Sequence, residues 1–207
     1  MTQARPRLLH RALHLEYLTV GWNIIEGFVA LAAASASGSV ALLGFGIDSF
    51  VESASGSIMI WRLTAERDAD EDDQERIEQV ERRARQLVAA SLVLLAAYVA
   101  WDSITSLLAA ERPQPSLPGI LLAVASLSVM WWLARAKRLV GTALGSRAMT
   151  ADAFQTDACF WLSLFLLVGI GTNALFDLWW ADPLAALGMT VFIAREAVEA
   201  WRGDDDH

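Results

Sequence analysis

Long apolar stretches separated by short polar connectors dominate the chain. A helix needs roughly 20 mostly apolar residues to cross a lipid bilayer. Six stretches are of about that length, at residues 14–34, 39–61, 87–110, 117–134, 149–173 and 183–201. Three connectors, "ASASGS", "ERPQPS" and "TNALFDLWWADP", carry the glycine, proline, serine and asparagine residues of tight turns. The pattern predicts an all-α integral membrane protein with six transmembrane helices, forming one domain over residues 1–207.

The connector 62–86 differs from the others because it is long and charged. Apolar residues recur on one helical face over 77–87, and Glu78 lies one turn before Arg82, a spacing that favours an ion pair. We therefore expect a helix that extends the third span into the cytosol. The acidic cluster 68–73 either lies in a solvated turn or concentrates cations near an entrance.

Both ends of the predicted membrane domain carry boundary signals. The N-terminal "MTQARPRLLHRALHLEYL" is basic and continues into a longer apolar helix without a small-residue cleavage site. We therefore expect a retained first span rather than a signal peptide. Asp182 followed by Pro183 predicts a helix N-cap and the first helical position of the sixth span.

Basic residues collect on one side of the predicted membrane. If the six spans alternate, the other side receives only Arg112. The first side receives Arg5, Arg7, Arg11, Arg62, Arg67, Arg76, Arg82, Arg83, Arg85, Arg135, Lys137, Arg138, Arg147, Arg195 and Arg202. By the positive-inside rule both termini are cytoplasmic. A miscount by one span would destroy this segregation, so the charge pattern also supports six spans.

Composition agrees with a membrane protein and excludes several other classes. Hydrophobic residues make up 55% of the chain, which is a poor fit to a soluble domain. The net charge of −8 comes largely from "ERDADEDDQERIEQVE" and "GDDDH", so it says little about partners. Basic residues are too few and scattered for a nucleic-acid surface. The single cysteine, Cys159, excludes an internal disulfide framework.

Two carboxylates lie inside the second predicted span, in "GFGIDSFVES". Asp48 and Glu52 are one helical turn apart and therefore share a face. A charged group in the hydrocarbon region costs several kcal/mol, so such residues usually face a cavity or mark an ion path. Ser49, Ser53 and Gly56 lie beside this face, and small residues let a neighbouring helix approach closely.

The fifth span presents a second polar face, in "TADAFQTDACFWLS". Asp152, Gln155 and Cys159 fall at positions i, i+3 and i+7 and share this face. Asp157 is displaced from Gln155 by more than a right angle around the helix. Asp157 therefore lines a second surface, or the helix is rotated from this orientation.

These two faces are predicted at matching depths in the membrane. At about 1.5 Å per residue, Glu52 and Asp48 lie about 15 and 21 Å from the inner interface. On the fifth span, Gln155 and Cys159 lie about 12 and 18 Å from it. We therefore expect these four side chains to form a cage, with Asp152 on its cytoplasmic approach at about 7.5 Å.

Carboxylates with a thiolate in a tight cage suit a divalent metal ion, and the sulfur favours Zn²⁺ over Mg²⁺ or Ca²⁺. Crowded carboxylates in a dry site hold protons until a cation arrives and take them back when it leaves. Such an exchange is a physical basis for antiport of a metal against protons. We expect a transported cation and no permanently bound cofactor.

Each candidate ligand also has a structural interpretation. Cys159 alone is usually a small buried hydrophobic residue, and Gln155 often only bonds a neighbouring helix. Glu26 of the first span lies at a similar depth, with Asn23 one turn before it. Glu26 is either a further site residue or a structural polar group.

At these residues the chain resembles the cation diffusion facilitator (cation efflux) family. "SVALLGFGIDSFVESASG" resembles the second transmembrane helix of that family, and "SRAMTADAFQTDACFWLS" and "WWADPLAALGMTVFIAREA" resemble the fifth and sixth. The resemblance implies a transporter in the bacterial inner membrane, usually a homodimer. It would export Zn²⁺ or a similar divalent cation in exchange for protons.

The resemblance also has departures. Asp48 and Glu52 match the acidic or histidine pair of the family's second helix, whereas Gln155 and Cys159 replace the histidine and aspartate of its HxxxD motif. The loss of the histidine removes the family's usual ligand and proton carrier. The chain ends soon after the sixth span, as in a short transmembrane-only branch without the cytoplasmic C-terminal domain. Dimerisation is then expected through membrane helices or the connector 62–86.

Two other classes of function remain open at this stage. A membrane scaffold or metal sensor would use the same carboxylates only to bond helices together. An intramembrane aspartyl protease has a GxGD motif, to which "GFGID" is a near miss with the spacing off by one residue. Its partner tyrosine–aspartate pair is absent, because "LFD" ending at Asp177 falls at the outer end of a span. We therefore expect a transporter and not an enzyme.

Overall fold

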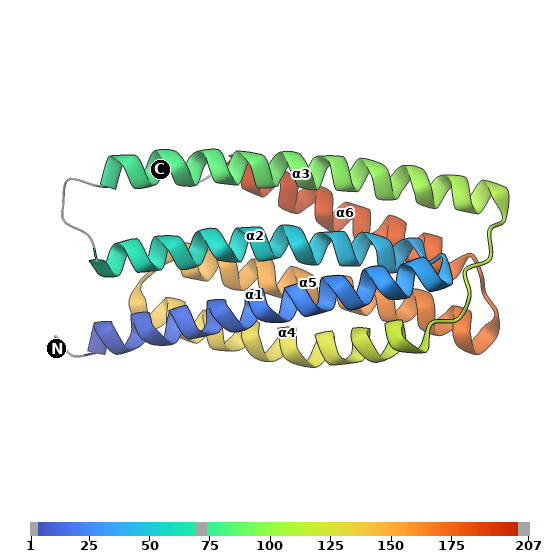
Figure 1. Ribbon diagram of the computed structural model, residues 1–207, viewed down its shortest axis with the longest axis horizontal. Coiled ribbons are helices and arrows are strands. Elements are labelled where there is room, and N and C mark those ends of the chain that lie inside the picture. The colour runs from blue at the N-terminus through green and yellow to red at the C-terminus, as the bar shows by residue number, and fades with distance from the viewer. Residues whose placement is uncertain (1–3, 69–73, 203–207) are drawn as a thin grey trace.

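Six long helices run along one common axis in the computed structural model, which describes residues 4–68 and 74–202 (Figure 1). They are α1 (Ala4–Ser37), α2 (Val40–Asp68), α3 (Gln74–Ala109), α4 (Leu117–Leu144), α5 (Arg147–Phe176) and α6 (Ala181–Arg202). The described residues contain no β-strand. The prediction of an all-α fold with six helices is confirmed.

Within the described residues, four segments are long and apolar enough to cross a membrane by themselves. These are Pro6–Ser37, Leu92–Ala109, Leu117–Leu144 and Asp152–Phe176. The remaining helices, α2 and α6, run beside them along the same axis (Figure 1). α2 packs against α1, α3, α5 and α6, so its polar side chains can face other helices instead of lipid. This packing explains how a helix with two carboxylates can lie inside a membrane bundle.

The charged connector 62–86 is divided between two helices. α3 begins at Gln74, so residues 74–86 do extend the third span as a helix. Residues 62–68 extend the second span instead, because α2 continues to Asp68 through residues without glycine or proline. The remaining residues of the acidic cluster, 69–73, lie outside the described part of the chain.

A tight hairpin joins α4 to α5. Gly145 ends α4 in the left-handed conformation, with φ of 65°, which glycine adopts without steric penalty. Ser146 then caps α5 by accepting a hydrogen bond from the Met149 N–H at 3.3 Å. Because the turn is short, α4 and α5 are antiparallel neighbours. Lys137 and Asp152 therefore lie at a similar distance from the turn on neighbouring helices.

Asp182 caps a different helix from the one that the sequence indicated. α6 already begins at Ala181, so the prediction that Asp182 is the N-cap of its own helix is wrong. Its buried carboxylate accepts hydrogen bonds from the Ser39 hydroxyl at 2.5 Å and from the Val40 N–H at 3.0 Å. The start of α2 is thereby fixed to the start of α6. Local sequence could not reveal this contact, because the partners are 143 positions apart.

We predict that Asp182→Ala lowers the free energy of unfolding by about 1–3 kcal/mol, because it leaves a buried hydroxyl and a backbone N–H at the start of α2 without their acceptor. Thermal unfolding of the detergent-purified protein measures the loss. Asp157→Ala, which removes a partly exposed carboxylate, is the control and should change stability little. Equal losses in both variants would contradict the capping role.

Candidate functional site

The side chain of Glu52 in α2 contacts side chains of two other helices, α1 and α5. Its carboxylate accepts one hydrogen bond from Nδ2 of Asn23 in α1 at 3.0 Å and another from the thiol of Cys159 in α5. All three side chains are buried, with exposed fractions of 0% for Asn23, 6% for Glu52 and 4% for Cys159. We call these three residues the Glu52 centre. The centre joins an amide, a carboxylate and a thiol inside the bundle.

A second set of carboxylates lies at the contact between α1 and α2. Asp48 stands one turn from Glu52, is buried, and interacts electrostatically with Glu26. Glu26 accepts hydrogen bonds from the Trp22 indole N–H and the Ser49 hydroxyl, both at 3.3 Å. α1 therefore contributes polar groups to the site alongside α2 and α5.

Two buried oxygen atoms at the site have no hydrogen-bond donor. In the described part of the chain, Asp48 Oδ1 and Asn23 Oδ1 lack a partner. Buried acceptors in native proteins are usually satisfied, so these atoms are available to a cation. Within residues 4–68 and 74–202, however, no three acidic, cysteine or histidine side chains are placed to hold a metal ion. To surround a metal ion with ligands, Asp48, Glu52 and their neighbours would therefore have to move closer together.

A buried ion triad lies closer to the α4–α5 hairpin than the Glu52 centre does. Nζ of Lys137 in α4 donates to Glu16 Oε2 at 3.0 Å and to Asp152 Oδ2 at 2.5 Å. Lys137 and Glu16 are completely buried, and Asp152 is 8% exposed. We call these residues the Lys137 triad. It pairs one ammonium with two carboxylates within the bundle.

The triad is aligned with the Glu52 centre along two helices. Seven residues separate Glu16 from Asn23 in α1, and seven separate Asp152 from Cys159 in α5. Seven residues are about two helical turns, or about 10.5 Å along a helix axis. Both pairs therefore lie on common helix faces, and the triad is stacked below the centre on the side of the hairpin.

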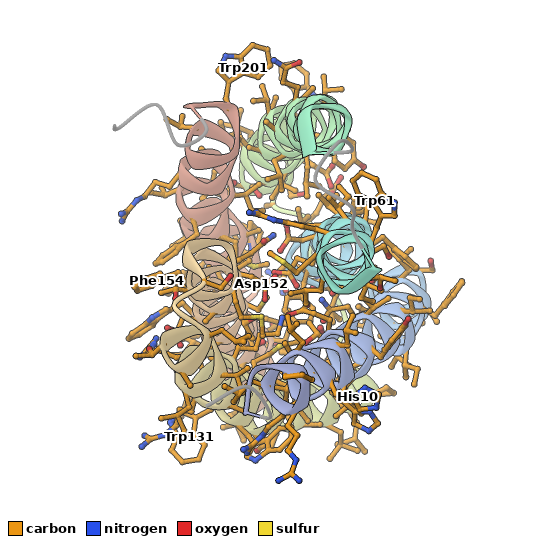
Figure 2. The ribbon with its side chains drawn as sticks, turned by 90° about the vertical axis from the view of Figure 1, so that its left-hand side faces the viewer. His10, Trp61, Trp131, Asp152, Phe154 and Trp201 are labelled. Atoms are coloured by element: carbon orange, nitrogen blue, oxygen red, sulfur yellow. The ribbon has the colours of Figure 1, made fainter. Side chains whose placement is uncertain are left out.

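The structure places Asp152 in this ion triad. Figure 2, seen from the end of the bundle that contains the hairpin, shows Asp152 toward the middle. Trp61, Trp131 and Trp201 lie at the periphery of the same view. The Asp152 carboxylate forms an ion pair with the Lys137 ammonium. To bind a metal ion, Asp152 would have to break this ion pair.

Gln155 and Asp157 have other partners. Gln155 Oε1 accepts a hydrogen bond from the Ser55 hydroxyl of α2 at 3.2 Å. Asp157 forms an ion pair with Arg138 of α4 at the surface. The expected cage of four side chains is therefore not assembled, although Glu52 and Cys159 of that cage are in contact.

Lys137 and Glu16 were not singled out from the sequence. Lys137 was counted with the basic residues of the inner side, whereas the structure buries it completely. A signal for its burial was present, because Lys137 continues the buried stripe of Met130, Leu133 and Val140 along α4. Glu16 likewise stands two turns before Asn23 on one helix face.

Together these features define a class of protein: a membrane helix bundle with carboxylates and a thiol buried at helix contacts, as in ion carriers. A family profile described as the cation efflux transmembrane domain matches residues 17–202. The chain belongs to the cation efflux family. The family resemblance drawn from the sequence is thereby confirmed.

One relative is an uncharacterized transporter of the cyanobacterium Synechocystis sp.. The two sequences are 28% identical over 177 residues, which are 83% of this chain and 56% of the relative. The chain thus spans little more than half the length of the curated relative that it matches.

Proposed function

We propose that the protein transports a divalent metal cation across the bacterial inner membrane, with Zn²⁺ as the favoured substrate, in exchange for protons. The observation that carries this proposal is the Glu52 centre, where a carboxylate and a thiol from α2 and α5 are in contact. Oxygen and sulfur ligands together suit Zn²⁺ better than Mg²⁺ or Ca²⁺. Asp48, one turn away, supplies a further carboxylate, and its Oδ1 has no hydrogen-bond partner among residues 4–68 and 74–202.

The contact between Glu52 and Cys159 supports coupling to protons. The thiol of Cys159 donates a hydrogen bond to the Glu52 carboxylate, whereas a metal ion binds the deprotonated thiolate. A cation that binds both groups must therefore displace this proton, and the proton must return when the cation leaves. Occupation by a cation and by a proton would then be mutually exclusive at one pair of side chains.

The remaining candidates take secondary roles in this proposal. Glu26 adds negative charge from α1 beside Asp48. Gln155 lies between Asp152 and Cys159 on α5 and becomes a ligand only after it leaves Ser55. Alternating access would then consist of a change in how α1, α2 and α5 pack around the cation. A homodimer of this chain would form through membrane helices or the connector 62–86.

Flux measurements test the proposed function. Protein in liposomes that enclose a Zn²⁺-sensitive dye should carry Zn²⁺ when a proton gradient is imposed. Asp48→Ala and Glu52→Ala should each abolish this flux while the purified protein stays monodisperse, because each removes a carboxylate from the proposed site. Asp157→Ala, on the surface of α5, is the matched control and should retain flux.

The same preparation separates the alternatives. Binding of Zn²⁺ without flux in the parent protein would favour a metal sensor or scaffold. Equal flux in the parent, Asp48→Ala and Glu52→Ala proteins would remove the site from the transport mechanism. Flux that ignores the proton gradient would contradict antiport but leave cation transport in place.

A further inference from the structure

We propose that the Lys137 triad is a barrier that closes the cytoplasmic side of the Glu52 centre, with the Lys137 ammonium acting as a tethered cation in the path of the substrate. This inference rests on the proposed function for the identity of the substrate. It does not depend on which divalent cation is carried. Neither the family match nor the related transporter assigns a role to Glu16 or Lys137.

The triad lies between the hairpin end of the bundle and the Glu52 centre. Glu16 and Asp152 lie two turns from Asn23 and Cys159 on the same faces of α1 and α5. A cation that moves between these helices from the hairpin end therefore meets the triad before it meets Glu52. By the distribution of basic residues, the hairpin end is the cytoplasmic end.

The triad is also closely packed by the surrounding helices. Lys137, Glu16 and Asp152 are at most 8% exposed, so solvent hardly reaches them. α2 also packs against α1 at the level of the triad. Gly56, one turn beyond Glu52, lies close to Val20 of α1. A Cβ atom on Gly56 would come within 2.8 Å of Val20 and 3.8 Å of Glu16 Oε2. Residues of α1, α2, α4 and α5 thus pack together at the level of the triad.

The charges explain how such a barrier can open. The triad holds two carboxylates for one ammonium, and Glu16 Oε1 has no hydrogen-bond partner among the described residues. An incoming divalent cation can therefore replace Lys137 as the counter-ion of Asp152. When Asp152 is released from Lys137, α4 and α5 lose their buried ionic contact at this level. The surface pair of Arg138 and Asp157 joins the same two helices but lies outside the proposed path.

The single cysteine offers a direct test, because Cys159 lies behind the proposed barrier and is buried. A membrane-impermeant cationic methanethiosulfonate reagent is applied to inside-out vesicles, which expose the cytoplasmic face, and to right-side-out vesicles. In the parent protein, labelling of Cys159 from the cytoplasmic face should be slow. Asp152→Asn should accelerate it by about 10-fold or more, because loss of a hydrogen bond between charged groups shifts an opening equilibrium by at least that factor.

The matched control is Asp157→Asn, which breaks the surface pair between the same helices and should leave the labelling rate within about 2-fold of the parent, as expected for exposed ion pairs. If Asp152→Asn gives no folded protein, the triple variant Glu16→Gln, Lys137→Met, Asp152→Asn carries the same test, because it removes the ammonium and leaves no unpaired buried charge. Acceleration only from the cytoplasmic face supports the barrier. Acceleration from both faces, equal acceleration by Asp157→Asn, or fast labelling of the parent protein from the cytoplasmic face would each overturn it.

Labelling requires no metal ion and no flux, so the barrier and the proposed function can fail separately. One-sided acceleration in a protein without Zn²⁺ flux would keep the barrier and reject the transport assignment. Normal flux that depends on Glu52, combined with an unchanged labelling rate in Asp152→Asn, would keep the transporter and reject the barrier.

Discussion

Replacement of Glu52 by glutamine is expected to weaken Zn²⁺ binding more than any other single substitution in the bundle. Glu52 contacts both Asn23 and Cys159, so it links the three helices that form the proposed site. Glutamine keeps the shape of the side chain but removes its negative charge. Loss of even an outer-sphere partner of a metal ligand typically weakens binding 10–100-fold, so we expect a loss of more than about 100-fold for the ligand itself.

Isothermal titration of the purified protein with Zn²⁺ measures this loss. Asp157→Asn makes the same chemical change on a partly exposed carboxylate of α5 and serves as the control. Its affinity for Zn²⁺ should match that of the parent protein. An affinity of Glu52→Gln within a few-fold of the parent, with an unchanged helical spectrum, would show that Zn²⁺ binds elsewhere.

Replacement of Lys137 by methionine is expected to destabilise the protein strongly. Methionine fills a similar volume but leaves the carboxylates of Glu16 and Asp152 buried without a counter-ion. Removal of one partner from a buried ion pair typically costs about 3–5 kcal/mol. The midpoint of thermal unfolding in detergent should therefore fall well below that of the parent protein.

The triple variant Glu16→Gln, Lys137→Met, Asp152→Asn separates charge from packing. It removes all three charges while nearly preserving the volume of the side chains. Replacing a whole set of buried ionic groups by uncharged residues often changes the free energy of unfolding little. We expect it to recover most of the stability that Lys137→Met loses. If the triple variant is as unstable as the single variant, the loss comes from packing around Lys137 and not from unpaired charge.

The helices themselves follow from local features of the sequence. Their apolar stretches, the serines before α4 and α5, and Gly145 between those helices act over a few residues, so they can be recognised without the fold. The shared face of Asp48 and Glu52 is also local, because one helical turn brings residues four apart together. Both carboxylates are indeed buried.

The partners of these side chains depend on how whole helices are rotated against one another. Cys159 was expected near Glu52 from depth alone, and the two are in contact. The same depth argument placed Gln155 in a cage, yet its amide bonds Ser55. Depth fixes the position along a helix axis but not the direction in which a side chain points. That direction is decided by packing with neighbouring helices.

The sequence by itself determined an all-helical membrane fold, the order of its helices and the face that carries Asp48 and Glu52, since helix formation and helical periodicity are local properties. Only the tertiary structure decided that Glu52 meets Asn23 and Cys159, and that Lys137 is buried between Glu16 and Asp152. The physical reason is that an ion pair such as Lys137 with Glu16 joins residues 121 positions apart. This ion pair forms only after separate helices have packed together, so no local sequence pattern can specify it.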